Sequence, residues 1–163
     1  IDDAAKVHHL LNLFPSDYNV SVGISNSFHR IEYLREALRE AQDALSTGKS
    51  IDSKRRVFPF EELSISIMLR HFSEKEDISR FIHPAVLRLK QYDDEYNTKL
   101  LTTVREYIQQ SGSIKKTAEA LFMHRNSVIY RLRKAEEICD ISLDDPDTQF
   151  ALRMSFCILK TLG

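Results

Sequence analysis

One short stretch of the sequence concentrates positive charge. Between Ser113 and Ala135 six basic side chains stand against the single acid Glu119, a local net charge of +5, although the whole chain has a net charge of −1. Gathered basic side chains can neutralise the phosphates of a nucleic acid, and an Arg can also bond a base edge through two donors. The six are Lys115, Lys116, Arg125, Arg131, Arg133 and Lys134.

Metal and thiol chemistry have little support. His8 and His9 would project to different faces of a helix, and Cys139 and Cys157 lie far apart, outside any Cys-x-x-Cys pair. No second cluster of Cys or His residues completes a zinc site. We therefore expect no metal, no cofactor and two reduced, packed thiols.

Catalysis on phosphate esters also lacks its usual residues. One arrangement that holds phosphate and a metal ion is a glycine-rich acidic turn, and the four glycines of this chain are never adjacent. No motif for a serine or cysteine hydrolase is present either. We therefore expect no catalytic residues and no enzyme within this chain.

The composition is that of a globular protein, with 42% hydrophobic and 29% charged residues among 163. No apolar run approaches the roughly 18 residues that cross a bilayer, and the first residues do not resemble a signal peptide. We expect a cytoplasmic protein without a membrane partner. Because the chain begins at Ile1 and not at a Met, we also expect it to be the end of a longer protein.

The N-terminal part mixes strand and helix patterns. Apolar and polar residues alternate from Tyr18 to Ile24, which predicts a half-buried strand. The Ser25-Asn26-Ser27 cluster offers N-cap oxygens to a long amphipathic helix that ends at Gly48. The apolar stripe of that helix is Ile31, Leu34, Leu38, Ala41 and Leu45.

Beyond a polar loop, the residues VFPF at 57–60 predict a short edge strand interrupted by Pro59. The segment from Leu63 to Leu69 fits two structures: its alternation favours a strand, whereas the spacing of Leu63 and Ile67 permits a helix. Residues 81–92 are predicted to be helical, with Pro84 in the first turns.

From Tyr96 onward the periodicity is helical, so we divide the chain after residue 95. One helix ends at Gly112, Ser113 can cap a second, and residues 122–125 leave room only for a tight turn before a third. Asp145 and Pro146 open a fourth. The inward stripes are Leu101, Val104 and Ile108; Ile114, Ala118 and Leu121; Val128, Leu132 and Ala135; and Ala151, Met154, Ile158 and Leu162. We expect Leu121 and Leu132 to face each other in the core.

The outward side of the third helix is basic if its stripe points inward. A helix-turn-helix unit places its second helix in the major groove of DNA, with N-terminal side chains at base edges. Tyr130 fits either a phosphate contact or a half-buried core position, and His124 fits either a DNA contact or a turn. An ordinary solvated surface is the competing explanation for the basic face.

The stretch SIKKTAEALFMHRNSVIYRLRKAEEI resembles the C-terminal helix-turn-helix of bacterial regulators of the PucR and CdaR family, most closely in TAEALF, HRNS and YRL. The resemblance continues through ISLDDPDTQFALRMSFCIL and covers roughly residues 95–163. Upstream, YNVSVGISNSFHRIEYLREALREAQDAL is similar to the end of the GGDEF-like region that precedes this domain in the family, which favours helix for Leu63 to Leu69. Two residues depart from the family: Ile129, where a basic residue is usual, and Ala135, where a larger aliphatic residue is usual.

This resemblance implies a mostly α fold, α+β overall, in which a partial α/β GGDEF-like regulatory region (residues 1–95) precedes an all-helical helix-turn-helix DNA-binding domain (residues 96–163). It implies a sequence-specific transcriptional regulator that controls a catabolic operon in response to a metabolite bound outside this chain. The expected DNA-binding residues are His124, Arg125, Asn126, Ser127, Tyr130, Arg131, Arg133, Lys134, Lys115 and Lys116.

We expect a homodimer on double-stranded DNA, because one helix-turn-helix reads few base pairs and specific affinity usually comes from paired half-sites. Two alternatives remain. The first is a degenerate cyclic-dinucleotide-type enzyme domain, since the family's upstream region resembles diguanylate cyclases. The second is a pure dimerisation or protein-interaction module, which would leave the basic face unexplained.

Overall fold

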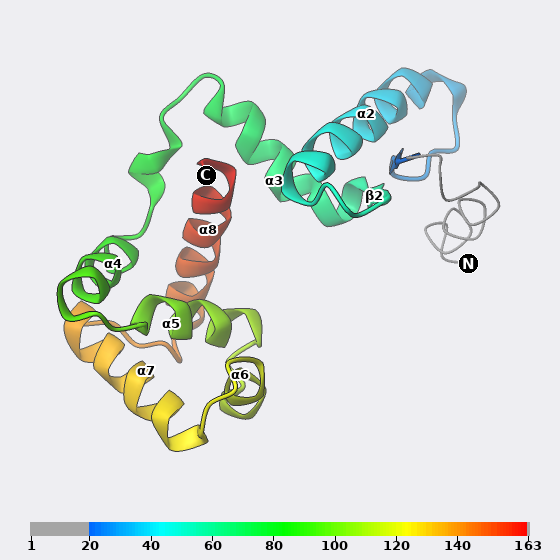
Figure 1. Ribbon diagram of the computed structural model, residues 1–163. Coiled ribbons are helices and arrows are strands. Elements are labelled where there is room, and N and C mark those ends of the chain that lie inside the picture. Colours follow the sequence, from blue (N-terminus) through cyan, green and yellow to red (C-terminus); the bar gives the residue numbers. More distant parts are fainter. Residues whose placement is uncertain (1–19, 163) are drawn as a thin grey trace. The chain divides into compact units, whose positions relative to one another are not determined.

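The structure of the chain is a computed structural model that describes residues 20–162 (Figure 1). The chain divides into two compact units, residues 1–76 and 77–163, and each unit has a hydrophobic core of its own. In the described part, most residues belong to helices, and the only two strands have three residues each. The fold is therefore mostly α, as the sequence predicted.

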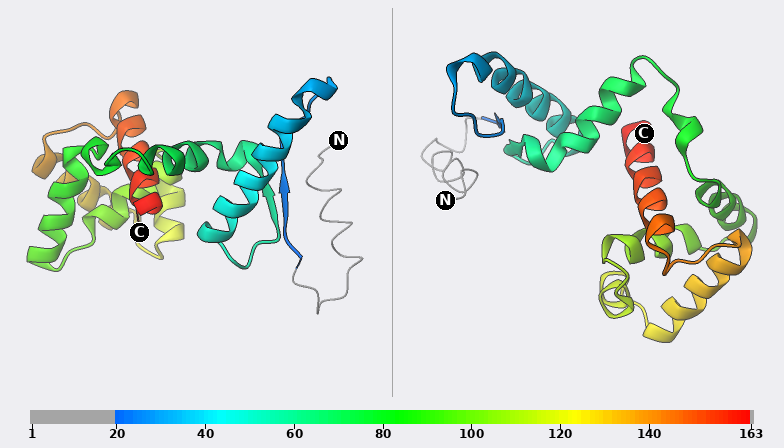
Figure 2. Two further views of the ribbon diagram at one scale, coloured as in Figure 1. Left: turned by 90° about the horizontal axis from the view of Figure 1, so that it is seen from above. Right: turned by 180° about the vertical axis from the view of Figure 1, so that it is seen from behind.

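The N-terminal unit is a two-stranded sheet with one long helix packed on both strands and a second helix packed on the first (Figure 2). The strands pair in parallel, with Val22 opposite Val57. Both predicted strands are present but short, and Tyr18 and Asn19 of the first lie outside the described residues. The elements are β1 (Val22–Ile24), a 3-10 turn (Ile31–Tyr33), α2 (Leu34–Ile51), β2 (Val57–Pro59) and α3 (Phe60–Ser73).

Helix α2 buries small residues, and only the C-terminal part of the predicted stripe lies against the sheet. Ala44 is fully buried on the side that faces the sheet. The strand lies so close to this side that a Cβ on Gly23 would come within 1.9 Å of the Ala41 carbonyl oxygen. The Leu45 side chain lies on the same side, with its Cβ 3.0 Å from that position. Of the predicted stripe, Ala41 and Leu45 are half-buried, and Ile31, Leu34 and Leu38 are exposed.

The ends of α2 also differ from the prediction. No side chain caps the helix at Tyr33, and the Ser25-Asn26-Ser27 cluster lies before the 3-10 turn. Asn26 instead donates its backbone N–H (2.8 Å) and its side-chain amide (3.3 Å) to the carboxylate of Glu40. At the other end, Gly48 is an interior helical residue and the helix continues to Ile51.

Residues 63–69, which fitted both strand and helix, are helical and belong to α3. Leu63 and Ile67 are buried, whereas Ile65 between them is 46% exposed. The four-residue spacing and the family resemblance were therefore right, and the alternation was misleading.

The C-terminal unit is a bundle of five α-helices (Figure 1). Helix α7 packs on α5, and α6 contacts both of them. The helices are α4 (Pro84–Tyr96), α5 (Leu100–Gln109), α6 (Ile114–Ala120), α7 (Arg125–Cys139) and α8 (Pro146–Leu162), preceded by a 3-10 turn (Ile78–Phe81). The most deeply buried core residues are Val86, Leu89, Val104, Ile108, Val128, Ala135 and Leu152.

This compact unit begins at Asp77 and not at residue 96, where the sequence placed the division. The reason is α4, which buries Ala85, Val86 and Leu89 in the core shared with α5 and α7. The predicted helix over residues 81–92 corresponds to α4, with Pro84 as its first residue. The helical periodicity of α4 resembled that of the preceding segments, so it gave no sign of where the packing changed.

Helix α8 is rotated relative to the prediction. Ile158 is buried as expected, but the other buried residues are Leu152 and Ser155, and Leu162 is 50% exposed. Ser155 can enter the core because its hydroxyl donates to the Ala151 carbonyl and accepts from the His83 backbone N–H, both at 2.8 Å. Neither α8 nor any other helix of residues 20–162 is long and apolar enough to span a membrane.

Both cysteines are free thiols. Cys139, at the end of α7, is 4% exposed, and burial raises the pKa of its thiol, which therefore stays protonated at neutral pH. Cys157 is half-buried in α8. Within residues 20–162 no group of three or more His, Cys, Asp or Glu side chains is placed to hold a metal ion.

Asp93 fastens α4 to α5. Helix α4 ends in the left-handed residue Asn97, and the chain then turns directly into α5. One carboxylate oxygen of Asp93 accepts from the Thr98 hydroxyl (2.5 Å) and the Leu100 N–H (2.7 Å), and the other accepts from the Leu101 N–H (2.9 Å). Two donors that would otherwise be unpaired at the start of α5 are thereby satisfied.

Asp93→Ala is expected to lower the free energy of unfolding by about 1–2 kcal/mol, because it leaves these donors at the start of α5 without their acceptor. Asp94→Ala is the matched control, since Asp94 is the neighbouring residue on the same helix. Urea unfolding of the full chain, followed by circular dichroism, measures both. Equal midpoints for the two variants would mean that the Asp93 bonds contribute nothing.

Candidate nucleic-acid interface

The tight turn between α6 and α7 is held by backbone bonds at the end of α6. Phe122 adopts a left-handed conformation, with φ of 53°. Its N–H donates to the Glu119 carbonyl (3.2 Å), and the Met123 N–H donates to the Ala118 carbonyl (2.9 Å). This pattern ends a helix abruptly, so α7 begins at Arg125 after the few residues that the sequence allowed.

Both helices of this pair are capped at their N-termini by side chains. Ser113 accepts from the Lys116 N–H (3.4 Å), which confirms the predicted cap of α6. His124 caps α7, because its Nδ1 accepts from the Asn126 N–H (3.2 Å). With Nδ1 acting as the acceptor, the proton of the neutral ring is on Nε2. His124 therefore has a structural role at the turn, and its Nε2–H remains as a donor.

The inward stripe of α7 lies where the sequence placed it. Val128, Leu132 and Ala135 are 0%, 6% and 0% exposed. Tyr130 is 67% exposed, which rules out the half-buried core position. The outward residues of α7 that are exposed as expected are Arg125, Asn126, Ser127, Tyr130 and Arg133.

Three of the predicted DNA-binding residues have partners within the domain. Arg131 is half-buried, and its Nη1 donates to the hydroxyl of the buried Thr103 on α5 (3.4 Å). Lys134 is paired with Glu137 (3.2 Å), whose carboxylate raises the pKa of Lys134. Lys115 lies 4.0 Å from Glu119, one helical turn away. The positive charge of each lysine is therefore partly compensated by a neighbouring glutamate on the same helix.

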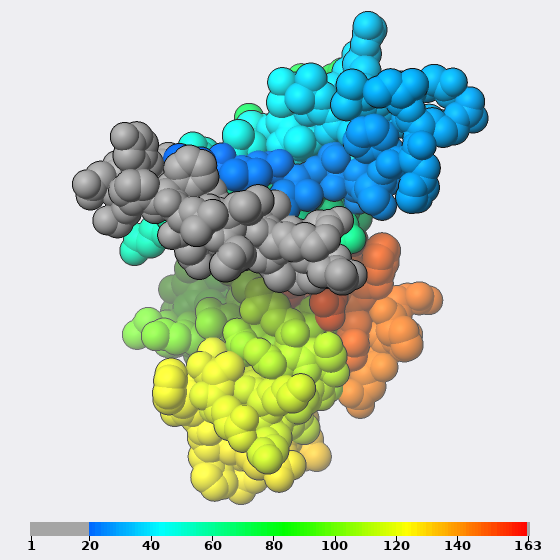
Figure 3. All heavy atoms as spheres, turned by 90° about the vertical axis from the view of Figure 1, so that its right-hand side faces the viewer, coloured from blue at the N-terminus to red at the C-terminus, as the bar shows by residue number. Residues whose placement is uncertain are grey.

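The remaining basic residues of the cluster are open to solvent. Lys116, Arg125 and Arg133 are exposed and make no side-chain hydrogen bond or ion pair to another residue in the range 20–162. Arg125 lies in the first turn of α7, directly after the His124 cap. In Figure 3 the turn between α6 and α7 (yellow-green to yellow) lies on the surface that faces the viewer.

An open hollow separates α6 from the first turns of α7. Both charged and apolar side chains line it, and the half-buried Ile129 forms part of its wall at the position where the family usually has a basic residue. The lining residues include Lys115, Glu119, Phe122, Arg125, Asn126 and Ile129. The hollow thus gathers donors and an exposed aromatic ring around the start of α7.

Two residues of this region were absent from the sequence prediction. Thr103 holds Arg131 through a contact between α5 and α7, which no local pattern indicates. Phe122 is 97% exposed, and it had a sequence signal: a large apolar residue standing in a turn between two helices, outside both apolar stripes.

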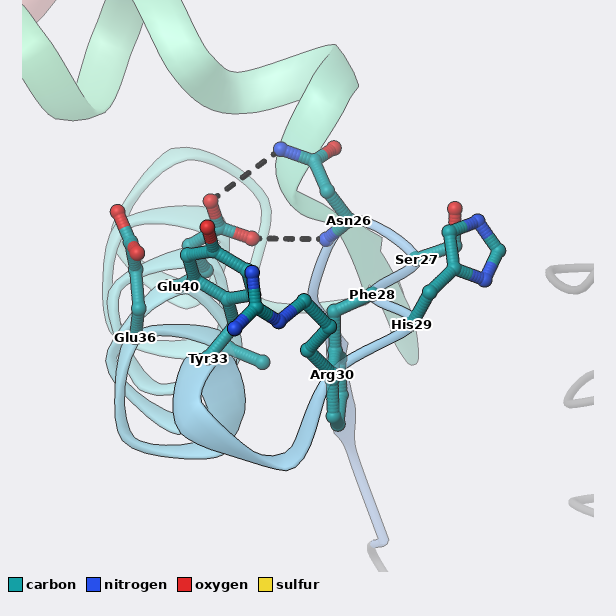
Figure 4. Close-up of a pocket in the computed structure, with 9 residues that line it drawn as sticks. Asn26, Ser27, Phe28, His29, Arg30, Tyr33, Glu36 and Glu40 are labelled. Atoms are coloured by element: carbon teal, nitrogen blue, oxygen red, sulfur yellow. Dashed lines mark hydrogen bonds between the residues drawn. The ribbon is translucent and has the colours of Figure 1, made fainter.

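A second hollow lies in the N-terminal unit, between the loop before α2 and α2 itself (Figure 4). Figure 4 shows the carboxylate of Glu40 turned toward Asn26, to which it is bonded twice. Arg30 is paired with Glu32 at 2.7 Å. Three of the polar lining residues, Asn26, Arg30 and Glu40, thus already have partners within the protein.

Residues 100–158 match the family model of the PucR C-terminal helix-turn-helix domain. This part of the chain is a PucR-type helix-turn-helix domain. The match includes α5, α6, α7 and most of α8, and it confirms the resemblance inferred from TAEALF, HRNS and YRL. The PucR-type domain thus contains the turn, the capped α7 and the open basic residues described above.

Curated relatives match a longer part of the chain. A purine catabolism regulatory protein of Bacillus subtilis is 36% identical over 146 residues, which cover 88% of this chain and 27% of the relative. A proline-responsive transcriptional activator of the same organism is 25% identical over 142 residues, covering 86% of this chain and 34% of the relative. The chain thus spans about a third or less of the length of these relatives.

A solved structure, the regulator of polyketide synthase expression from Bifidobacterium adolescentis, aligns with a TM-score of 0.37 and 22% identity. The alignment covers 75% of this chain and 49% of that one.

Proposed function

We propose that this chain is the DNA-binding output part of a transcriptional regulator. One observation carries the proposal: α7 buries its apolar stripe almost completely, while Arg125 in its first turn is exposed and has no partner within residues 20–162. A helix that follows such a turn can enter the major groove with its N-terminal side chains at the bases.

The proposal gives different roles to different residues. Arg125 and Asn126 read base edges, for which their paired donors and acceptors are suited. His124, Ser127, Tyr130 and Arg133 contact the DNA around them, and Lys115 and Lys116 on α6 meet phosphates, because the first helix of this motif crosses the backbone. Arg131 and Lys134, which have partners within the domain, position α7 and contribute charge.

For the whole protein we propose control of a catabolic operon in the cytoplasm, in line with the names of the purine and proline regulators. A metabolite would be sensed by a region outside this chain, and the N-terminal unit would be part of a GGDEF-like regulatory region. The proposal includes no catalytic step. It includes a homodimer, since a two-fold pair of α7 helices would read two half-sites.

Selection of bound duplexes from a random DNA pool with this chain tests the proposal. The expected product is a common motif repeated with two-fold symmetry, with half-site centres about 10–10.5 base pairs apart or a multiple of that spacing. A single unrepeated motif would support DNA reading and contradict the dimer. A pool that stays random after several rounds would contradict sequence-specific binding itself.

A further inference from the structure

Phe122 has an unusual environment for a large apolar side chain. It is 97% exposed, the highest exposure among the large hydrophobic residues of the described part of the chain. Its backbone is left-handed, a conformation in which Gly or Asn usually ends a helix. Neither burial nor backbone preference accounts for a phenylalanine here. The folded domain by itself would be served better by a glycine.

The ring stands among the residues that are proposed to meet DNA. Phe122 lines the same hollow as Lys115, Arg125 and Asn126, and it directly precedes the two residues that lead into α7. A surface that combines an apolar ring with cations fits a partner that offers negative charge and a small apolar group together. The major groove of DNA does so, because each thymine presents a 5-methyl group there beside the phosphate backbone.

We propose that Phe122 reads a thymine methyl group in the major groove, next to the bases contacted from the first turn of α7. The inference rests on the proposed function, since it requires that α7 enters this groove. It adds an apolar determinant to the hydrogen bonds of Arg125 and Asn126. A half-site should then contain at least one position where thymine is preferred and where the preference depends on its methyl group alone.

Replacement of thymine by deoxyuridine removes only that methyl group. In the selected operator, each thymine is replaced in turn, and affinity is measured for the full chain and for Phe122→Ala. The parent should lose about 3- to 10-fold at one position in each half-site, the range expected for one buried methyl group or a little more. Phe122→Ala should bind the normal operator more weakly by a similar factor and should no longer distinguish thymine from deoxyuridine at that position.

Two further variants separate reading from folding. Phe122→Gly suits the left-handed backbone, so it should melt no earlier than the parent and yet lose the same thymine preference. Phe150→Ala is the matched control, because Phe150 is a 66% exposed phenylalanine on α8, outside the hollow lining. Its affinity and its response to deoxyuridine should equal those of the parent.

Three results would overturn the inference. A parent that is indifferent to deoxyuridine at every position would show that the ring reads no methyl group, while leaving DNA binding intact. A Phe122→Ala chain that changes its sedimentation but not its DNA affinity would assign the ring to contacts between copies of the chain. A parent that binds no DNA sequence selectively would overturn the proposed function and this inference together.

Discussion

Leu132→Ala is expected to lower the free energy of unfolding of the chain by about 2–5 kcal/mol. Leu132 is 6% exposed in the middle of α7 and belongs to the core formed with Val104, Ile108 and Val128. Truncation removes the buried surface of the side chain and leaves a cavity that the neighbouring helices fill only in part. A decrease of this size is a large fraction of the stability of a typical domain, so DNA binding should fall with it.

Thermal and urea unfolding by circular dichroism measure this decrease, and two leucines serve as controls. Leu121 was expected opposite Leu132 in the core, but it is half-buried at the end of α6 and lies outside that core. Leu121→Ala should therefore cost clearly less. Leu87→Ala, at a 53% exposed site on α4, should be nearly neutral. A Leu132→Ala chain that melts within a degree or two of the parent would show that the inward face of α7 is assigned wrongly.

Arg125→Ala is expected to remove discrimination between the operator and random DNA. The guanidinium of Arg125 is exposed in the first turn of α7, with no partner in residues 20–162 to hold it away from a base. An Arg bonded in two places to a guanine contributes about 1–3 kcal/mol of discrimination. The variant should thus bind its operator about 5- to 150-fold more weakly, with a much smaller change on random DNA.

The double variant Lys115→Ala, Lys116→Ala provides the contrast. Both residues lie at the start of α6, so they should meet phosphates and carry no sequence information. Affinity for operator and random DNA should fall alike, and the slope of log affinity against log salt should decrease by up to about one for each phosphate that is no longer neutralised. Because Lys115 is already near Glu119, most of the change should come from Lys116. If Arg125→Ala weakens both DNAs equally, Arg125 is not reading bases.

The helix-turn-helix could be predicted closely from the sequence because its packing follows local rules. Val128, Leu132 and Ala135 are spaced to share one face of a helix, and that face is buried. Ser113 is a good N-cap residue at the end of a turn, and it caps α6. In such segments the spacing of apolar residues indicates which face of the helix is buried.

The prediction was wrong where contacts between distant residues decide the packing. In α2 the sheet approaches so closely that Gly23 and Ala44 lie at the interface, whereas the large residues Ile31, Leu34 and Leu38 of the predicted stripe are exposed. In α8 the hydroxyl of Ser155 finds partners in Ala151 and in His83, which is 72 residues away. Because a serine is usually a surface residue, the apolar spacing of α8 alone predicted a different buried face.

In the candidate site, too, features set by local spacing could be predicted, and features set by contacts between distant residues could not. Exposure of Arg125 and Arg133 could be predicted, since it follows from the opposite, buried stripe. The engagement of Arg131 could not, because its partner Thr103 is 28 residues away on another helix. The cap formed by His124 was not predicted. It is a local contact, but histidine is not among the residue types usually expected at an N-cap.

The carboxylate of Asp93 joins the last turn of α4 directly to the first turn of α5. Any rotation of α4 about α5 would have to break three hydrogen bonds at once, so the two helices should move together. The family match begins at residue 100, whereas α4, which these bonds join to α5, begins at Pro84. A fragment cut at the start of the family match would therefore lose the acceptor that holds the first turn of α5, together with the buried Val86 and Leu89.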